Sequence, residues 1–298
     1  ALSTVLAEVP ELVQVLDAEQ ALTLSGIRQP SGGYWYPASG WLRPASVCKA
    51  LAAHHNIEVI EACGELALEA GNDQWQAVAA GTAVATAHCA VIATGTAAVT
   101  MSQLSWLPLQ SIRGQTTDLP STRASADLKT ALCHQGYIAP ARNGHHCIGA
   151  TFKPHDNDPE LRVGEHRHNL AKLAAAVPAW RNALEQLDSG TLDGRVGFRC
   201  ASPDYLPVVG PVPDLQAFLR DYAPLRKNAK QTIATRGEYL PGLYLTAAHG
   251  SRGLTSTPLA AELLASLVCA EAPPLSRKLC RALAPARFIM RDLTRNRI

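Results

Sequence analysis

The sequence is poor in aromatic residues and contains no long apolar run. Aromatic residues make up 5% of its 298 residues, and no apolar stretch reaches the roughly 18 residues that a membrane-spanning helix needs. We therefore expect no membrane among the partners of this protein. The formal net charge of +2 is small, so it permits an anionic partner without requiring one.

Motifs of several other protein classes are also missing. The eight cysteines form no C-x-x-C pair, which argues against a zinc ribbon or a disulfide scaffold and favours free thiols in a reducing cytoplasm. Neither G-x-S-x-G nor G-x-x-x-x-G-K-[ST] occurs, so hydrolase and P-loop functions lack support. We expect no metal site, because the central histidines lack the spacing of a hydrolytic zinc centre. These are His145, His146, His155, His166 and His168.

The few aromatic residues are concentrated in one short stretch. Tyr34, Trp35, Tyr36 and Trp41 fall within eight positions, among glycine, proline and serine residues. The alternating pattern and the Gly-Gly pair of residues 22–44 predict a hairpin of two strands. Its aromatic side chains are suited equally to core packing and to a platform for a nucleic-acid base.

Apolar periodicity predicts the other elements of the chain. A helix is expected around Leu2 and Val5. The further expected elements are a helix at 44–55, a short strand and a loop in 56–70, two strands in 75–98, a strand in 107–120, a hairpin closed by Asn143 and Gly144, a helix in 162–187 interrupted at Pro178, a strand at 194–201 followed by a proline-rich turn, and a strand, turn and helix in 242–269.

The order of these elements predicts two domains. Both ends of the chain have an α/β pattern, and the middle has the pattern of an antiparallel sheet with helices. The sequence therefore predicts an α/β plus α+β fold with one domain inserted into the other. Residues 1–19, 43–106 and 237–298 form the first domain in this interpretation, and residues 20–42 and 107–236 form the inserted one.

Two glycine-containing turns are candidates for ligand binding. In HGSRGLTSTP, Gly250 and Gly253 flank Ser251 and Arg252 directly before a predicted helix. The free N–H groups at a helix start favour anionic or electron-rich ligand atoms, although a plain turn would have the same sequence. In VIATGTAA, an apolar strand ends at Thr94 and Gly95, a pattern that many α/β sheets share without binding a nucleotide.

Basic residues supply two further candidates. Arg199 lies in an otherwise apolar strand, where a guanidinium needs an anionic partner. That partner is either an acid such as Asp204 or the carboxylate of a substrate. The last segment, residues 276–298, carries seven Lys or Arg against one Asp; it suits either RNA phosphates or a solvated terminus.

Six segments of the sequence together carry a family resemblance. They are SGGYWYPASGWLRPASVCKAL, VIATGTAA, LQSIRGQTTDLP, GRVGFRCASPDYLPVVGPVPD, GLYLTAAHGSRGLTSTPLAAELLAS and LCRALAPARFIMRDLTR. In this order they resemble the FAD-dependent oxidoreductase domain of the MnmC family of bifunctional tRNA-modification enzymes, within the D-amino-acid-oxidase-like superfamily. The resemblance covers nearly the whole chain.

The resemblance implies a flavin reaction on the tRNA wobble uridine. FAD would oxidise the C–N bond of 5-carboxymethylaminomethyl-2-thiouridine, glyoxylate would leave after hydrolysis of the imine, and the 5-aminomethyl form would remain. A methyltransferase domain that uses S-adenosylmethionine precedes this domain in the family. The first domain predicted above would then bind FAD in a Rossmann-like fold, and the inserted domain would bind substrate.

The resemblance also implies roles for individual residues. Arg199 would bind the substrate carboxylate, and Arg252 would lie beside the pyrimidine edge of the flavin as a second catalytic residue. Tyr34 and Tyr36 would form a wall over the uridine. The remaining implied contacts to FAD are Gly40, Trp41 and Leu42 at the isoalloxazine, Thr94 and Gly95 near the ADP half, and Gly250, Ser251, Gly253 and Leu254 through their backbone.

Two departures from the family pattern keep alternatives open. The fingerprint G-x-G-x-x-G, which normally holds the dinucleotide pyrophosphate, does not occur in the sequence, and neither does the methyltransferase domain. We therefore expect a C-terminal piece of a longer protein, with an incomplete FAD-binding domain and weak or no activity by itself. The alternatives are an oxidase of free glycine or D-amino acids and a cofactor-free tRNA-binding fragment.

Overall fold

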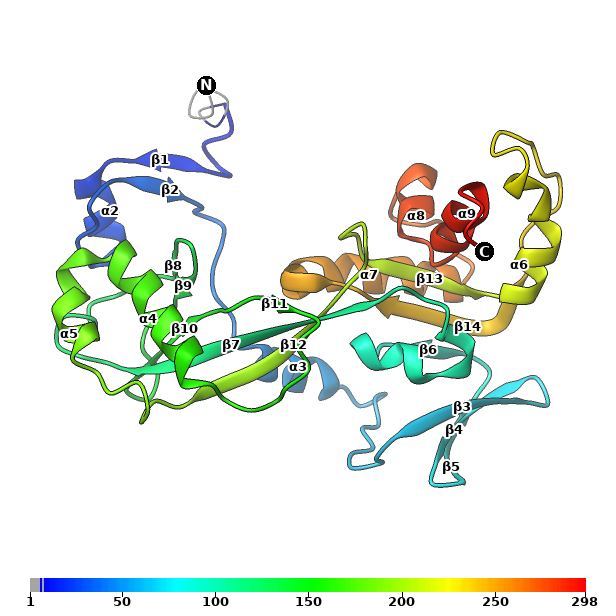
Figure 1. Ribbon diagram of the computed structural model, residues 1–298, viewed down its shortest axis with the longest axis horizontal. Helices are drawn as coiled ribbons and strands as arrows, with labels where there is room; N and C mark the ends of the chain where they lie inside the picture. Colours follow the sequence, from blue (N-terminus) through cyan, green and yellow to red (C-terminus); the bar gives the residue numbers. More distant parts are fainter. Residues whose placement is uncertain (1–5, 7) are drawn as a thin grey trace. The chain divides into compact units, whose positions relative to one another are not determined.

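The computed structural model describes residue 6 and residues 8–298, and the helix expected around Leu2 and Val5 lies outside them. The chain forms two compact units (Figure 1). Unit 1 contains residues 1–54 and 113–197, and unit 2 contains residues 55–112 and 198–298. These boundaries differ in position from the expected domain boundaries, and the assignment of one domain to FAD and the other to substrate stays a prediction. No helix of the described residues is both long and apolar enough to cross a membrane.

Unit 1 is built on an antiparallel sheet covered by helices. Strand β10 pairs with β7 and with β9, and β9 pairs with β8. The elements of this part of the chain are β1 (Gln14–Leu16), α2 (Ala18–Ser25), β2 (Gly33–Trp35), α3 (Pro44–Ala52), β7 (Gln110–Pro120), β8 (Leu132–Cys133), β9 (Tyr137–Ile138), β10 (His145–Gly149), β11 (Lys153–Pro154), α4 (Val163–Ala176), η3 (Pro178–Trp180), α5 (Arg181–Glu185) and β12 (Gly194–Ala201), with the far ends of β7 and β12 reaching into unit 2.

The hairpin predicted for residues 22–44 is wrong. Its first four residues, 22–25, are helical, because Asp17 caps helix α2: the Asp17 carboxylate accepts from the Gln20 N–H, and the Gln20 side chain accepts from the Asp17 N–H. This reciprocal capping box starts a helix that runs to Ser25. Strand β2 consequently pairs with β1, with Trp35 opposite Gln14.

Other predictions for unit 1 are confirmed. The hairpin of β9 and β10 closes at Asn143 and Gly144, whose φ angles of 52° and 78° are those of a tight hairpin turn, which asparagine and glycine adopt most readily. Helix α4 forms where expected, and Pro178 ends it. The buried side chains of α4 pack on the sheet around Ile138 and Ile148, and this cluster is the core of unit 1.

Unit 2 contains two three-stranded sheets, with the strand orders β13-β14-β6 and β3-β4-β5. Its elements are β3 (Leu66–Gly71), β4 (Gln74–Ala79), β5 (Thr82–Ala87), β6 (Ala90–Ile92), η1 (Gly95–Thr100), η2 (Ser102–Leu104), β13 (Val208–Pro213), α6 (Leu215–Asp221), η4 (Ala223–Arg226), β14 (Tyr239–Ala247), η5 (Gly250–Arg252), α7 (Gly253–Val268), α8 (Arg277–Leu283) and α9 (Ala286–Thr294).

The structure corrects two predictions in unit 2. Residues 75–98 form three strands rather than two, because the turn at Ala80 and Gly81 divides the first of them. Residues 208–213 form strand β13 instead of a proline-rich turn. Proline is tolerated there because β13 lies at the edge of its sheet.

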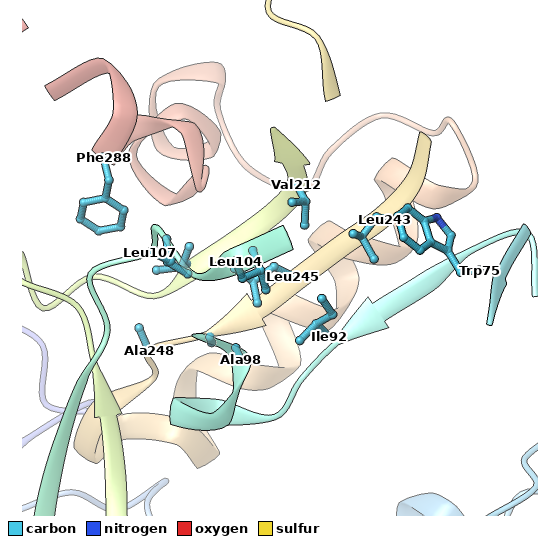
Figure 2. Packing of buried hydrophobic residues seen from close by; sticks show 12 residues of the cluster. Trp75, Ile92, Ala98, Leu104, Leu107, Val212, Leu243, Leu245, Ala248 and Phe288 are labelled. Carbon is cyan, nitrogen blue, oxygen red and sulfur yellow. The ribbon is translucent and has the colours of Figure 1, made fainter. Parts of the chain in front are cut away.

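Figure 2 shows the buried core of unit 2, to which strands β4, β6 and β14 and helix α9 contribute side chains. Leu243 and Leu245 of β14 meet Ile92 of β6, Trp75 of β4 and Phe288 of α9 in one buried cluster. Helix α7 packs along β13 and β14 through a second cluster around Leu263. The fold is therefore a mixed α/β arrangement with several antiparallel sheets, and the strand, turn and helix predicted for residues 242–269 are confirmed.

Candidate functional site

The connection between β14 and α7 contains two residues with positive φ angles. Ala248 and Gly250 have φ angles of 60° and 56°, in a region that residues with a Cβ rarely adopt. A Cβ placed on Gly250 would meet nothing within 4 Å, so the backbone is open to a ligand on that side. Non-glycine residues in this conformation are concentrated at functional sites.

Helix α7 begins without a side-chain cap. Arg252 occupies the capping position but makes no side-chain hydrogen bond to the first turn. The first N–H groups of this 16-residue helix therefore keep their capacity for an outside acceptor. Together with the helix dipole, they favour a negatively charged or electron-rich group near Ser251 and Arg252.

The predicted turn at Thr94 and Gly95 lies beside this connection. Strands β6 and β14 are parallel neighbours, with Ile92 opposite Leu245. Strand β6 ends at Ile92 and β14 ends two residues after Leu245, at Ala247, so their carboxyl ends share one edge of the sheet. Ligands of open α/β sheets bind at this edge.

Strand β12 brings Arg199 to the same neighbourhood. The Cβ of Cys200 lies 3.9 Å from the position of a Cβ on Gly95, and burial raises the pKa of the Cys200 thiol although a hydrogen bond with the Ala248 backbone opposes the shift. Arg199 precedes Cys200 in β12, and its side chain leaves the strand on the face opposite to that of Cys200. Unit 2 thus brings Cys200, Gly95 and the turn after β14 together, with Arg199 one residue away along the backbone.

Asp204, which the sequence offered as a partner for Arg199, forms an ion pair with Arg287 of α9. The Arg287 Nε lies 2.9 Å from Asp204 Oδ2, and the Arg287 Nη2 lies 3.0 Å from Asp204 Oδ1. Burial alone would raise the pKa of Asp204, but the hydrogen bonds from Arg287 and Ser202 outweigh burial and lower it to about 2. Asp204 is therefore ionised and engaged by α9 at neutral pH.

His249 connects the two ends of the turn, and sequence reasoning missed it. Its Nδ1 lies 2.8 Å from Ser256 Oγ on α7, and its Nε2 lies 2.9 Å from Thr246 Oγ1 on β14. Because Ser256 donates its own proton to the Arg252 carbonyl, it accepts from His249 Nδ1–H, and Thr246 donates to Nε2. The neutral imidazole therefore ties strand, turn and helix together.

This arrangement predicts a pH dependence. Burial lowers the pKa of His249 from 6.5, so the unfolded chain takes up its proton at a higher pH than the folded chain does. The stabilisation is complete above pH 6.5 and is lost as the pH falls toward the folded pKa. We expect the free energy of opening of the β14–α7 region, measured by hydrogen exchange, to be lower at pH 5.5 than at pH 8.

The matched variant for this prediction is His249→Gln, which keeps a polar side chain but does not titrate. Its opening free energy should change less between the two pH values than that of the wild type. Equal pH dependence in both proteins would show that another group is responsible.

A cavity in unit 1 collects part of the aromatic stretch. It has a volume of about 480 Å³ and lies between the β1–β2 ribbon, α2 and residues 130–134, which is within the usual size range of small-molecule pockets. Tyr34, Tyr36 and Gly40 line this cavity, together with Trp35 and His134. None of the lining residues carries a formal charge, so the cavity suits a neutral, flat group better than a carboxylate.

Two of the residues predicted to lie at the isoalloxazine are outside the cavity lining. Trp41 and Leu42 are exposed by 42% and 62% and precede helix α3, which has no buried residue. The cavity itself could not be found from the sequence, because one wall is helix α2, which had been interpreted as a strand.

The buried histidines of unit 1 are held by protein groups. His146 bonds to the Ala139 carbonyl and to Ser125, and His166 bonds to Thr117. Burial lowers the pKa of His166 although nearby acids oppose the shift. These two histidines belong to the hydrogen-bonded interior.

Comparison with known protein families identifies the class to which this chain belongs. The model of the FAD-dependent oxidoreductase family matches residues 4–267. The chain therefore belongs to the FAD-dependent oxidoreductase family, in agreement with an open turn before an uncapped helix at the carboxyl edge of a sheet.

Two curated proteins show high sequence identity to this chain. The chain is 42% identical over 292 residues to the tRNA 5-methylaminomethyl-2-thiouridine biosynthesis bifunctional protein MnmC of Chromobacterium violaceum, and 41% identical over 290 residues to the protein of the same name from Pseudomonas putida. Each match covers 97% of this chain and 44% of the relative. The chain thus spans less than half the length of the curated relatives it matches, and the family predicted from its six segments is confirmed.

Solved structures share the fold at low sequence identity. Glycine oxidase from Geobacillus kaustophilus superposes with a TM-score of 0.71 at 22% identity, covering 96% of this chain and 70% of that one. Iminodiacetate oxidase from Chelativorans sp. BNC1 gives 0.68 at 18% identity, with coverage of 95% and 70%. These likenesses concern the fold.

Proposed function

We propose that this chain is the oxidase part of an enzyme that shortens the side chain of a modified tRNA wobble uridine. The substrate is 5-carboxymethylaminomethyl-2-thiouridine, and the products are the 5-aminomethyl nucleoside and glyoxylate. The observation that carries the proposal is the identity of 41–42% over 97% of the chain to proteins named for 5-methylaminomethyl-2-thiouridine synthesis. A methyltransferase domain that uses S-adenosylmethionine would complete the sequence of reactions in the cytoplasm.

The residues of unit 2 fit FAD. Space around Gly250 allows a flat ring to approach the backbone, and the uncapped N-terminus of α7 suits the electron-rich edge of a flavin. In this proposal Arg252, with the backbone of Ser251, Gly253 and Leu254, holds that edge, and Thr94 and Gly95 lie near the ADP half. FAD would accept a hydride from the carbon beside the amine.

Unit 2 then corresponds to an incomplete Rossmann-like FAD-binding domain, and unit 1 supplies the substrate domain. Arg199 would bind the carboxylate of the glycine-like arm, which orients the C–N bond for oxidation to an imine. Water hydrolyses the imine, so that the carbon leaves as glyoxylate and the nitrogen stays on the nucleoside. Gly40, Trp41 and Leu42 would pass the isoalloxazine ring.

The cavity of unit 1 supports a nucleoside substrate over a free amino acid. Tyr34 and Tyr36 provide flat walls, on which a base can stack with about 1–3 kcal/mol per base. The absence of charged groups among the lining residues leaves nothing there to bind the ammonium and carboxylate of glycine. We therefore assign this cavity to the uracil ring.

The proposal is tested by product release. Protein supplied with FAD should release glyoxylate from tRNA carrying the carboxymethylaminomethyl group and should leave free glycine unoxidised. Faster flavin reduction by glycine than by this tRNA would favour a free amino-acid oxidase. A protein that binds tRNA but shows no flavin absorbance after reconstitution would be a binding fragment.

Replacement of Arg199 tests its assigned role. Arg199→Ala should raise KM for the modified tRNA about tenfold, which corresponds to about 1.4 kcal/mol, because the substrate carboxylate loses its guanidinium. Arg195→Ala on the same strand is the control and should leave KM unchanged. Wild-type kinetics for Arg199→Ala would refute the clamp.

A further inference from the structure

Positive charge is concentrated in two segments of unit 2. Residues 222–237 contain four basic residues and no acidic one, and residues 277–298 contain seven basic residues and one acidic one. Eleven of the 27 basic residues but only one of the 25 acidic residues thus lie in these segments. The rest of the chain has 16 basic and 24 acidic residues, so its net charge has the opposite sign.

The structure packs these two segments against each other. Leu225 of η4 is buried in one cluster with Ile289 and Leu293 of α9, and the Arg226 Nε donates to the carbonyl of Ile298 over 2.6 Å. The loop of residues 227–236 folds back toward Tyr222, whose hydroxyl donates a hydrogen bond to the Thr235 carbonyl over 3.0 Å. Figure 1 shows the segments in yellow and red.

The acids around this junction are already engaged. Asp292 lies 3.0 Å from Arg291 Nε, and Asp221 lies 2.7 Å from Arg220 Nε. Within the described part of the chain, four exposed cations in the stretches that directly follow η4 and α9 form no ion pair within 4 Å. We call these four residues the basic surface; they are Lys227, Lys230, Arg236 and Arg295.

We propose that the basic surface, whose residues follow η4 and α9, docks the phosphate backbone of an RNA, and that this RNA is the substrate tRNA. The identity of the RNA rests on the proposed function, whereas the attraction to phosphate rests on charge and packing alone. Exposed cations without acidic partners release counterions when they neutralise phosphates, which drives the binding of nucleic acids.

An RNA fits this surface better than an acidic protein does. The cations lie on two separate segments that are held together by the buried cluster of η4 and α9. They can therefore contact several phosphates spaced along an RNA strand. Because the rest of the chain is net acidic, it repels a polyanion and restricts docking to this face.

The experiment compares two variants that remove the same charge. Lys227→Ala with Lys230→Ala removes two cations of the basic surface, and Arg123→Ala with Lys129→Ala removes two exposed cations of unit 1. Binding of bulk tRNA to the chain is measured by filter retention across a series of salt concentrations. All four positions are exposed, and circular dichroism checks that both variants fold.

We expect the first variant to lower the slope of log K against log salt by about 2, at about 0.9 per phosphate contact, and to weaken tRNA binding at least tenfold. The Arg123 and Lys129 variant should keep the wild-type slope and affinity. Equal slopes in wild type and the Lys227 variant, or retention of polyglutamate in preference to tRNA, would overturn the proposal.

Turnover separates this proposal from the proposed function. Loss of tRNA affinity in the Lys227 variant without any glyoxylate release by the wild type would support the docking surface and refute the reaction. Glyoxylate release from tRNA with an unchanged KM in the Lys227 variant would support the reaction and refute the docking surface.

Discussion

Arg113→Met is expected to destabilise unit 1 by about 3–5 kcal/mol, the cost of breaking a buried ion pair on one side. Arg113 is fully buried, and its Nη1 lies 2.5 Å from Glu165 Oε1. The same guanidinium donates to the backbone carbonyls of Asp158 and Glu160. Methionine fills part of the volume but leaves the carboxylate and both carbonyls without this donor.

The ionisation of Glu165 makes the loss severe. Burial alone would raise its pKa, but the hydrogen bonds from Thr151 and Arg113 outweigh burial and hold the pKa below its usual value. Removal of Arg113 therefore leaves a buried negative charge. Lys153 lies 3.5 Å from it but is about half exposed, so it compensates only in part.

Hydrogen exchange of the α4 amides is the appropriate measurement, because a chain with two units need not unfold in one step. Arg113→Met with Glu165→Gln should recover part of the loss, since the unpaired charge is gone. Arg28→Ala is the control: Arg28 and Glu19 form a pair 3.1 Å apart with both side chains mostly exposed, worth about 0–1 kcal/mol. A loss below that of the control would contradict the predicted role of Arg113.

This network shows what the sequence could and could not predict. The strand of residues 107–120 and the helix after residue 162 follow from apolar periodicity. That Arg113, Gln115 and Thr117 share one face of β7 also follows, because strand side chains alternate. The sequence does not predict that this face contacts Glu165, His166 and Asn169, which lie within about one helical turn of each other on α4. That contact depends on how the helix packs on the sheet.

The candidate flavin site also has some features that the sequence predicts and others that it does not. Glycines before an apolar helix predict the turn after β14, and the structure places Thr94 and Gly95 next to it. The left-handed conformation of Ala248 and the bridge through His249 could not be predicted, because alanine carries no signal for a positive φ and the partners of His249 lie on two different elements. The hairpin prediction failed because the local capping box of Asp17 and Gln20 outweighed the alternation that follows it.

Phe288→Ala is expected to destabilise unit 2 by about 3–5 kcal/mol, the usual cost of removing a buried phenyl ring. Phe288 is 1% exposed and inserts from α9 into the cluster around Leu243 and Leu245 (Figure 2). The guanidinium carbons of Arg287 and Arg291 lie 4.2 Å and 4.9 Å from the centre of its ring, so each cation–π contact, worth about 0.5–1 kcal/mol, is lost as well.

The effect should reach beyond the core, because Phe288 holds helix α9, whose C-terminal end carries Arg295 of the basic surface. Hydrogen exchange should show faster opening of α9 and η4, which share a hydrophobic cluster, and the affinity for tRNA should fall although no charge has changed. Phe288→Leu, which keeps most of the buried volume, should cost less than about 1.5 kcal/mol and retain tRNA binding. Leu279→Ala on α8, at a side chain exposed by 50%, is the control and should change stability by less than about 0.5 kcal/mol. Equal opening of α9 in Phe288→Ala and Phe288→Leu would mean that the helix is held by the cluster around Ile289 and Leu293 instead.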